Sequence, residues 1–138
     1  REIIDRRADR TSRTPDPESV IDGDRVTELQ AVPETVRVDG KLRDYVIELG
    51  RATREDDRVD VGVSPRGIQR LFEASRSRAV IEGRDYVAPD DVRAVVHEAF
   101  EHRLVLTSEA TVRGVSNESI VEDAIDDIEV PAVATADD

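Results

Sequence analysis

Apolar residues recur every three or four positions over several stretches of the chain, a spacing that is typical of amphipathic helices. The clearest stretch predicts a helix capped by Asp39, with an apolar stripe of Leu42, Tyr45, Val46, Leu49 and Ala52. Another predicts a helix from Pro65 to about Glu82, with one face formed by Ile68, Leu71, Phe72, Ser75 and Ala79. Gly83 is the expected C-terminal stop of this helix, because glycine readily adopts the left-handed conformation.

Weaker patterns predict three shorter helices. The first is capped by Asp24 and ends or bends at Pro33. The second starts with Asp90 and Asp91, whose charges suit the positive end of the helix dipole, and its inner stripe is Val92, Val95, Val96 and Ala99. The third runs from about Ser119 to Asp127, with an inner face of Val121, Ala124, Ile125 and Ile128.

The remaining segments are extended or polar. Residues 36–38 and 84–88 are short strand-like pieces that we expect to pair with each other. Residues 55–63 form a polar connection, residues 103–107 are extended, and residues 108–118 are a polar loop. The fold class predicted from these patterns is all-α, a small helical bundle with a minor two-stranded β element.

Composition supports one helical domain with an aliphatic core. The chain has 138 residues, of which 38% are hydrophobic but only 3% aromatic. Cysteine is absent, which excludes disulfides and thiolate metal sites, and no apolar run is long enough to span a bilayer. We expect a cytoplasmic protein. Because the chain opens with Arg1 and lacks methionine, we also expect it to be a fragment or a processed product.

The formal net charge of -12 bears on partners and habitat. Duplex DNA and anionic membranes need a basic footprint, so neither is an expected partner. Residues 1–13 contain several arginines, but acidic residues alternate with them at helical spacing and predict a solvated, salt-bridged face. Lys41 is the only lysine, and an Asp-rich surface almost without lysine suggests adaptation to high salt.

The common catalytic and metal-binding patterns are missing. His97 and His102 lie five positions apart, about 140° around a helix, so they do not converge on one metal ion. No G-x-S-x-G elbow is present, and Lys41 after Gly40 lacks the rest of a phosphate-binding P-loop. We therefore expect no metal site and no ATP hydrolysis by these residues alone.

The segment Gly62–Gly67 is the best candidate site. Ser64 suits a helix N-cap, Pro65 suits the first helical position, and Gly62 gives the chain freedom to turn into the helix. Arg66 then lies in the first turn, where the helix dipole disfavours a cation. Two explanations remain open: Arg66 pairs with a neighbouring carboxylate, or it binds a phosphate together with free backbone N–H groups.

Several motifs together resemble the C-terminal lid of MoxR-family AAA+ ATPases. They are LGRATR at 49–54, GVSPR at 62–66, EGRDYVAPDDV at 82–92 and HRL at 102–104. The resemblance extends in order over nearly the whole chain, from Leu29-Gln30 to the closing IEVP at 128–131. Pro33 departs from the family pattern by interrupting a helix that is usually continuous, and Gly50 stands where a larger residue is usual.

The resemblance implies a role for Arg66 and a division of the chain. Arg66 matches the sensor 2 arginine, which contacts the γ-phosphate of ATP held with Mg²⁺ by a core domain that is absent here. Residues 1–24 would be the end of a core-domain helix and a linker, residues 25–131 the lid, and residues 132–138 a disordered tail. The parent protein would be an ATPase that forms a hexamer and remodels partner proteins, often von Willebrand A-domain proteins and sometimes in metal insertion.

Two other interpretations of the sequence remain. Residues 75–92 also resemble the closing helices of a histone fold, although a DNA-packing histone would be basic and about half this length. The chain would otherwise be a stand-alone helical adaptor that binds a protein partner without nucleotide chemistry. Arg51, Arg54 and Arg84 are lesser candidates for contacts between domains or subunits, and each is equally consistent with a surface ion pair.

Overall fold

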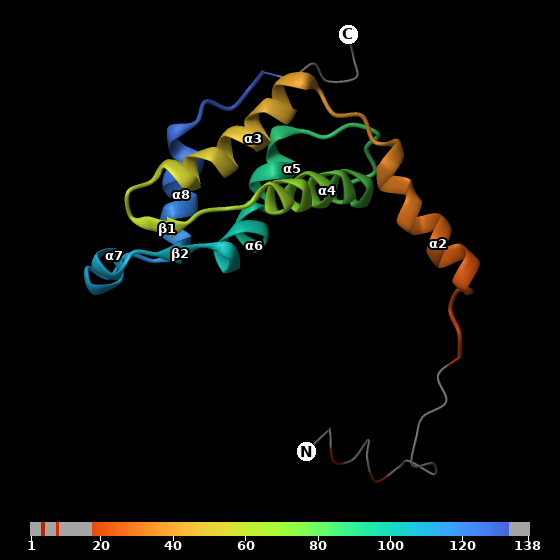
Figure 1. The fold of residues 1–138 in the computed structure, drawn as a ribbon. Helices are drawn as coiled ribbons and strands as arrows, with labels where there is room; N and C mark the ends of the chain where they lie inside the picture. Colours follow the sequence, from red (N-terminus) through yellow and green to blue (C-terminus); the bar gives the residue numbers. More distant parts are fainter. Residues whose placement is uncertain (1–3, 5–7, 9–17, 133–138) are drawn as a thin grey trace.

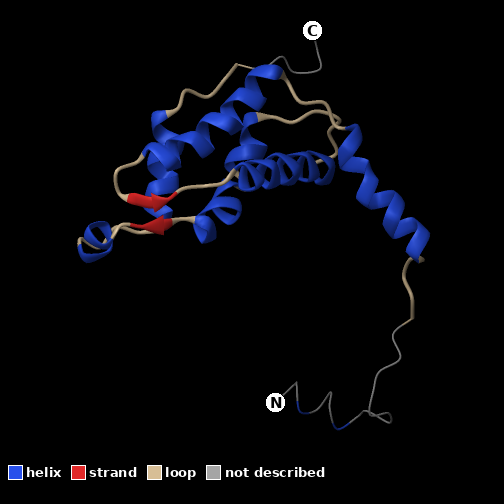
Figure 2. Ribbon diagram, in the orientation of Figure 1, coloured by secondary structure: helices blue, strands red, loops and turns tan. Residues whose placement is uncertain are grey.

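The computed structural model describes residues 4, 8 and 18–132 and confirms the predicted fold class, a helical bundle with one small two-stranded sheet (Figures 1 and 2). The longest helices are α3 (Gly40–Glu55) and α4 (Pro65–Ile81). The other elements are α2 (Gly23–Ala31), η1 (Val32–Thr35), β1 (Val59–Val61), α5 (Pro89–Arg93), α6 (Val96–Phe100), η2 (Glu101–Arg103), β2 (Val105–Leu106), α7 (Ser108–Val112) and α8 (Asn117–Asp127).

The core lies between α3, α4, α6 and α8. Helix α4 packs against α3, α5 and α6, and α8 packs against α3 and α6. The largest fully buried apolar side chains are aliphatic apart from one phenylalanine, and they include Leu42, Leu49, Leu71, Val92, Phe100 and Ile120. This composition confirms the expected aliphatic core.

The N-terminal cap of α3 and the C-terminal stop of α4 are as predicted. The Asp39 carboxylate accepts a hydrogen bond from the backbone N–H of Lys41, and Gly83, with φ +73°, follows the end of α4. The predicted cap of α2 is wrong. Asp22, not Asp24, accepts from the backbone N–H of Arg25, because Asp22 has the extended backbone of a cap whereas Asp24 already lies in the first turn.

The two-stranded sheet is not where the sequence predicted it. Strand β1 lies within the predicted polar connection and pairs antiparallel with β2, with Val59 opposite Leu106 and Val61 opposite Val105. The expected pairing of residues 36–38 with 84–88 is reduced to one parallel bridge between Arg37 and Tyr86. Alternation of side chains in such short segments does not choose between partners that are distant in sequence.

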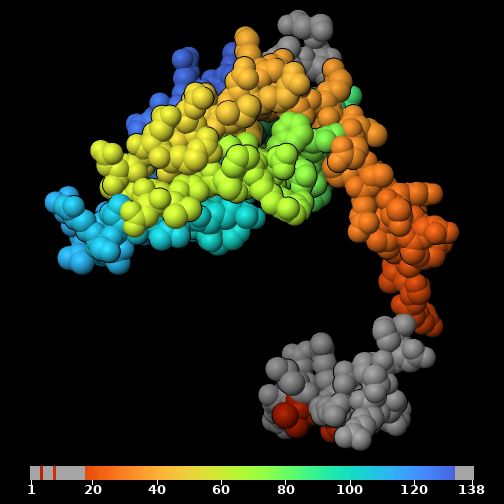
Figure 3. Space-filling view, viewed as in Figure 1, coloured from red at the N-terminus to blue at the C-terminus, as the bar shows by residue number. Residues whose placement is uncertain are grey.

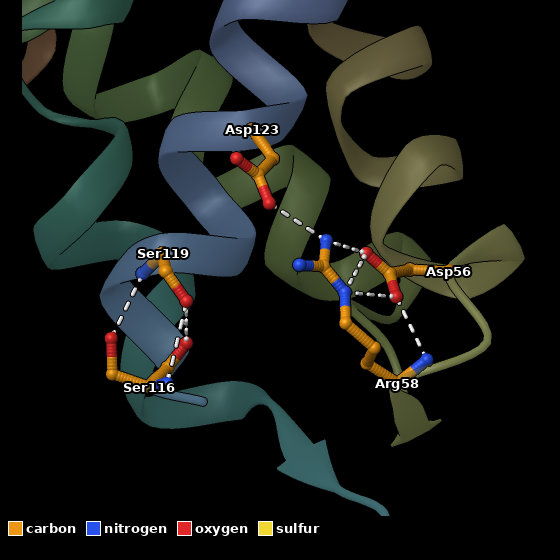
Figure 4. Close-up of polar contacts among 5 residues, drawn as sticks. All are labelled: Asp56, Arg58, Ser116, Ser119 and Asp123. Carbon is orange, nitrogen blue, oxygen red and sulfur yellow. Dashed lines mark hydrogen bonds and ion pairs between the residues drawn. The ribbon is translucent and has the colours of Figure 1, made fainter. Parts of the chain in front are cut away.

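Two helix predictions are also corrected. The helix expected after Pro89 is divided into α5 and α6, with Ala94 and Val95 between them. The predicted loop at 108–118 contains α7, which Thr107 caps by accepting from the backbone N–H of Ala110. Helix α8 begins at Asn117, slightly earlier than predicted, because Ser116 and Ser119 each accept a hydrogen bond from the other's backbone N–H (Figure 4).

Arg58 ties the segment before β1 to helix α8 (Figure 4). One terminal guanidinium nitrogen of Arg58 lies 2.6 Å from Asp56 Oδ2 and 2.8 Å from Asp123 Oδ2 on α8. The hydrogen bonds from Arg58 lower the pKa of Asp56, and burial opposes them only partly. The sheet and α8 are thereby joined through one cation shared by two carboxylates.

Helix α2 extends away from the bundle (Figures 1 and 3). None of its residues is buried, and an apolar groove separates it from the C-terminal end of α4, lined by Ile21, Val26, Leu29, Pro33, Val80 and Ile81. Apart from residues 4 and 8, the predicted core-domain helix at 1–13 lies outside the described residues, as does nearly all of the predicted tail. The domain boundaries proposed from the sequence therefore stay a prediction.

Candidate functional site

The first turn of α4 places Arg66 at an exposed position beside a capped helix start. Ser64 has extended backbone and accepts a hydrogen bond from the N–H of Gly67 at 3.3 Å, and Pro65 occupies the first helical position, as predicted. The turn contains no acidic residue. Within the described part of the chain, the Arg66 guanidinium has no carboxylate within 4.0 Å and no hydrogen-bond acceptor. The intramolecular ion pair that the sequence left open is therefore not formed among these residues.

The last turn of α3 is hydrogen-bonded to Val63, the residue that precedes the Ser64 cap. The backbone N–H of Val63, which is fully buried, donates to Thr53 Oγ1 at 3.0 Å. The Val63 carbonyl oxygen accepts from a terminal nitrogen of Arg54 at 2.8 Å. Thr53, also fully buried, donates to the carbonyl of Gly50. Both backbone groups of Val63 are thus bonded to α3, which fixes the direction in which α4 starts.

Gly62 is needed for close packing and not for turning freedom, so the sequence interpretation is corrected. Its φ is not in the left-handed region. A Cβ at this position would lie 2.6 Å from the Thr53 carbonyl oxygen and 2.7 Å from Arg54 Cα. Only a residue without a side chain lets the segment before α4 approach the backbone of α3 this closely.

Arg103, at the end of η2, lies against the first turn of α4. Its Nε donates to the carbonyl of Ala99 at 2.8 Å. A Cβ on Gly67 would lie 3.1 Å from Arg103 Cδ and 2.6 Å from a methyl group of Val63, so glycine leaves the space that the arginine stem occupies. Reasoning from sequence did not select Arg103 as a site residue, although it belongs to the HRL motif of the family resemblance.

The lesser arginine candidates have different roles. Arg51 lies 3.1 Å from Glu48 on its own helix and is an exposed surface ion pair. Arg84 donates through two nitrogens to Asp91, whose side chain is only 2% exposed, so this arginine is structural. Arg54, by contrast, belongs to the candidate site, because it bonds the residue next to Ser64.

His97 is bonded to two carboxylates outside this site. His97 Nδ1 lies 2.7 Å from Glu101, and its Nε2 lies 3.0 Å from Glu122 on α8. Burial alone would lower the pKa of His97, but the two carboxylates outweigh it and raise the pKa. No group of three or more His, Cys, Asp or Glu residues suited to a metal ion occurs among residues 4, 8 and 18–132.

The same residues contain no helix that is long and apolar enough to cross a membrane.

The sequence matches one family and several curated proteins. The family model described as "AAA lid domain" matches residues 51–124. "Uncharacterized protein YeaC" of Bacillus subtilis is 35% identical over 108 residues, which cover 78% of this chain and 34% of that protein. "Chaperone MoxR1" of Mycobacterium tuberculosis is 33% identical over 114 residues, covering 76% and 30%. The chain thus spans about a third of the length of these relatives.

A solved structure has the same fold. The crystal structure of a "putative ATPase" from Cytophaga hutchinsonii superposes with a TM-score of 0.82 at 24% sequence identity. The superposition covers 95% of this chain and 42% of that one. At this identity the comparison concerns the fold alone.

Proposed function

The chain belongs to the AAA lid domain family, in its MoxR group, and from this membership we propose that Arg66 is the sensor 2 arginine of an AAA+ ATPase. In this proposal the ATP, with its Mg²⁺, is bound by a core domain elsewhere in the longer protein. Arg66 contacts the γ-phosphate and couples hydrolysis to movement of the lid. That movement remodels partner proteins in the manner of a chaperone.

The observation that carries the proposal is the unpaired guanidinium of Arg66 on a rigidly held helix start. Most arginines between residues 18 and 132 pair with a carboxylate, whereas Arg66 is exposed and has no such partner among the described residues. Phosphate oxygens accept hydrogen bonds, and this turn carries a guanidinium group and no acidic side chain, so its chemistry fits a phosphate and not a cation. The bonds of Val63 to α3 support a fixed position for that cation.

The test is steady-state ATP turnover by the full-length protein in high salt, comparing the wild type with Arg66→Ala. We expect turnover to fall roughly ten- to a thousand-fold, as when one preorganised donor to developing charge is removed. Arg70→Ala is the matched control, because Arg70 lies one turn later on α4 and pairs with Glu73. Unchanged turnover in Arg66→Ala would refute the sensor 2 role. Absence of turnover in the wild type would instead favour a helical adaptor without nucleotide chemistry.

The proposal includes an assembly and a class of client. We propose that the parent protein forms a hexameric ring in which the lid contacts its own core domain and a neighbouring subunit. Von Willebrand A-domain proteins are the proposed clients, as the family resemblance implies. Co-purification of the full-length protein with such a domain, and its mass by light scattering with and without ATP, test these two statements.

The acidic surface supports a further proposal about habitat. With a net charge of -12 and a single lysine, the protein is proposed to be adapted to high salt, where counterions screen repulsion between carboxylates. Its unfolding midpoint is then expected to rise with NaCl concentration between about 0.1 and 3 M, the range over which the Debye length falls below about 3 Å. A midpoint that does not change with salt would contradict this proposal.

A further inference from the structure

Some arginines on this acidic chain form an ion pair with a carboxylate, and others do not. Between residues 18 and 132, most arginines have a carboxylate oxygen within 4.0 Å. Within this part of the chain, those without such a partner are Arg43, Arg54, Arg66, Arg93 and Arg103. On a surface with so many carboxylates, an arginine left without one is a feature that needs a reason.

Three of these unpaired arginines meet at the start of α4, although each comes from a different element. Arg54, from the last turn of α3, donates to the carbonyl of Val63 and packs against Gly62. Arg66 belongs to the first turn of α4 itself. Arg103, from η2, packs along Gly67, its Nε 3.7 Å from where a Cβ of that residue would be. The tertiary structure therefore brings to the start of α4 three arginines that have no carboxylate within 4.0 Å among the described residues.

The hydrogen bonds that the three arginines already make decide which of their nitrogens are free to bind a ligand. Arg54 uses a terminal nitrogen to hold the backbone of Val63, which makes it a positioning group. Arg103 uses only its Nε, in the bond to Ala99, so its two terminal nitrogens have no acceptor within the described part of the chain. Its side chain is half-buried and held at both Cδ and Nε, so little rotamer entropy remains to be lost on binding.

We propose that Arg103 is a second phosphate-binding arginine, which contacts the phosphate chain of the nucleotide together with Arg66. This inference rests on the proposed function, because it assumes that a nucleotide reaches the start of α4. A triphosphate carries several charged oxygens in a row, and two guanidinium groups from different elements bind more of them than one. Arg54 then acts indirectly, by fixing the backbone between the two binding arginines.

The proposal is tested by the affinity of the full-length protein for a fluorescent ATP analogue, without turnover. Arg103→Gln keeps much of the stem that packs on Gly67 but removes the charge, and we expect it to weaken binding about tenfold. Arg103→Lys restores a charge and is expected to bind more tightly than Arg103→Gln. Arg43→Gln is the control, because Arg43, which is exposed, is likewise unpaired within the described residues but lies at the opposite end of α3 from Arg54.

The outcomes separate the two proposals. Weaker binding in both Arg66→Ala and Arg103→Gln, with tighter binding by Arg103→Lys than by Arg103→Gln and with Arg43→Gln unchanged, supports the inference. If Arg66→Ala weakens binding while Arg103→Gln behaves as Arg43→Gln does, the inference is overturned and the proposed function stands. Arg103→Lys binding no better than Arg103→Gln would assign Arg103 to packing alone and also overturn it. Failure of the wild type to bind the analogue would refute the proposed function, and this inference with it.

Discussion

The buried ion pair between Arg84 and Asp91 allows a quantitative prediction about stability. The Asp91 side chain is 2% exposed and accepts hydrogen bonds from two nitrogens of Arg84, at 2.7 and 2.6 Å, and from the N–H of Ala88 at 2.8 Å. Burial by itself would raise the pKa of Asp91, but these hydrogen bonds outweigh it, and the pKa lies below its ordinary value. The carboxylate thus holds the loop after α4 to the start of α5.

Removing one partner of this ion pair lowers the free energy of unfolding by more than the intact pair contributes to it, because the other charge is left buried and unpaired. Asp91→Ala leaves the Arg84 guanidinium and the Ala88 N–H without their acceptor, and breaking a fully buried pair costs about 3–5 kcal/mol. The Arg84 side chain is 26% exposed and regains some hydration, so we expect a loss of about 2–3 kcal/mol. For a chain of this size, roughly 3 °C of melting temperature is lost per kcal/mol, which predicts a decrease of about 6–9 °C.

Urea unfolding of the wild type, Asp91→Ala, Arg84→Met and the double variant measures this effect. We expect a coupling energy of about 1–3 kcal/mol between the two positions, as for residues that share one hydrogen-bond network. Asp90→Ala is the control, because Asp90 is the exposed neighbour in the same helical turn. A loss in Asp91→Ala no larger than in Asp90→Ala, or a coupling energy near zero, would refute the reasoning. Because the folded pKa of Asp91 is lowered, its contribution is present above about pH 4 and is lost as the pH falls further.

Two further predictions concern a glycine and a histidine. Gly62→Ala places a Cβ 2.6 Å from the carbonyl oxygen of Thr53, so we expect a loss of about 1–3 kcal/mol in urea unfolding; Gly23→Ala, with open space around it, is the control, and equal effects would contradict the packing argument. The raised pKa of His97 means that its bonds to Glu101 and Glu122 stabilise the fold below about pH 6.5, and that this contribution is lost as the pH rises through the folded value. His97→Gln is therefore expected to reduce the change in unfolding free energy between pH 6 and pH 9, and an unaltered pH profile would show that the pair contributes nothing.

The sequence alone determined the features that depend on neighbouring residues. The caps at Asp39 and Ser64 and the stop at Gly83 were predicted correctly, because a cap or a left-handed glycine is decided within three or four positions. The inner faces of α3 and α4 followed from helical periodicity for the same reason. Arg66 was selected because a first-turn cation is visible in the sequence, and the family motifs around it pointed to its proposed role.

The tertiary structure decided whatever joins residues that are distant in sequence. Strand β1 finds its partner in β2, more than forty positions away, and no local pattern in a polar segment indicates that choice. The sequence assigned Asp91 to the helix dipole, whereas the fold buries it against Arg84, and burial decides what a charge does. Arg103 reaches the start of α4 because α6, which directly precedes η2, packs against α4. Its place against Gly67, the residue that follows Arg66 in the chain, is a property of the packed bundle, which is why the sequence did not reveal it.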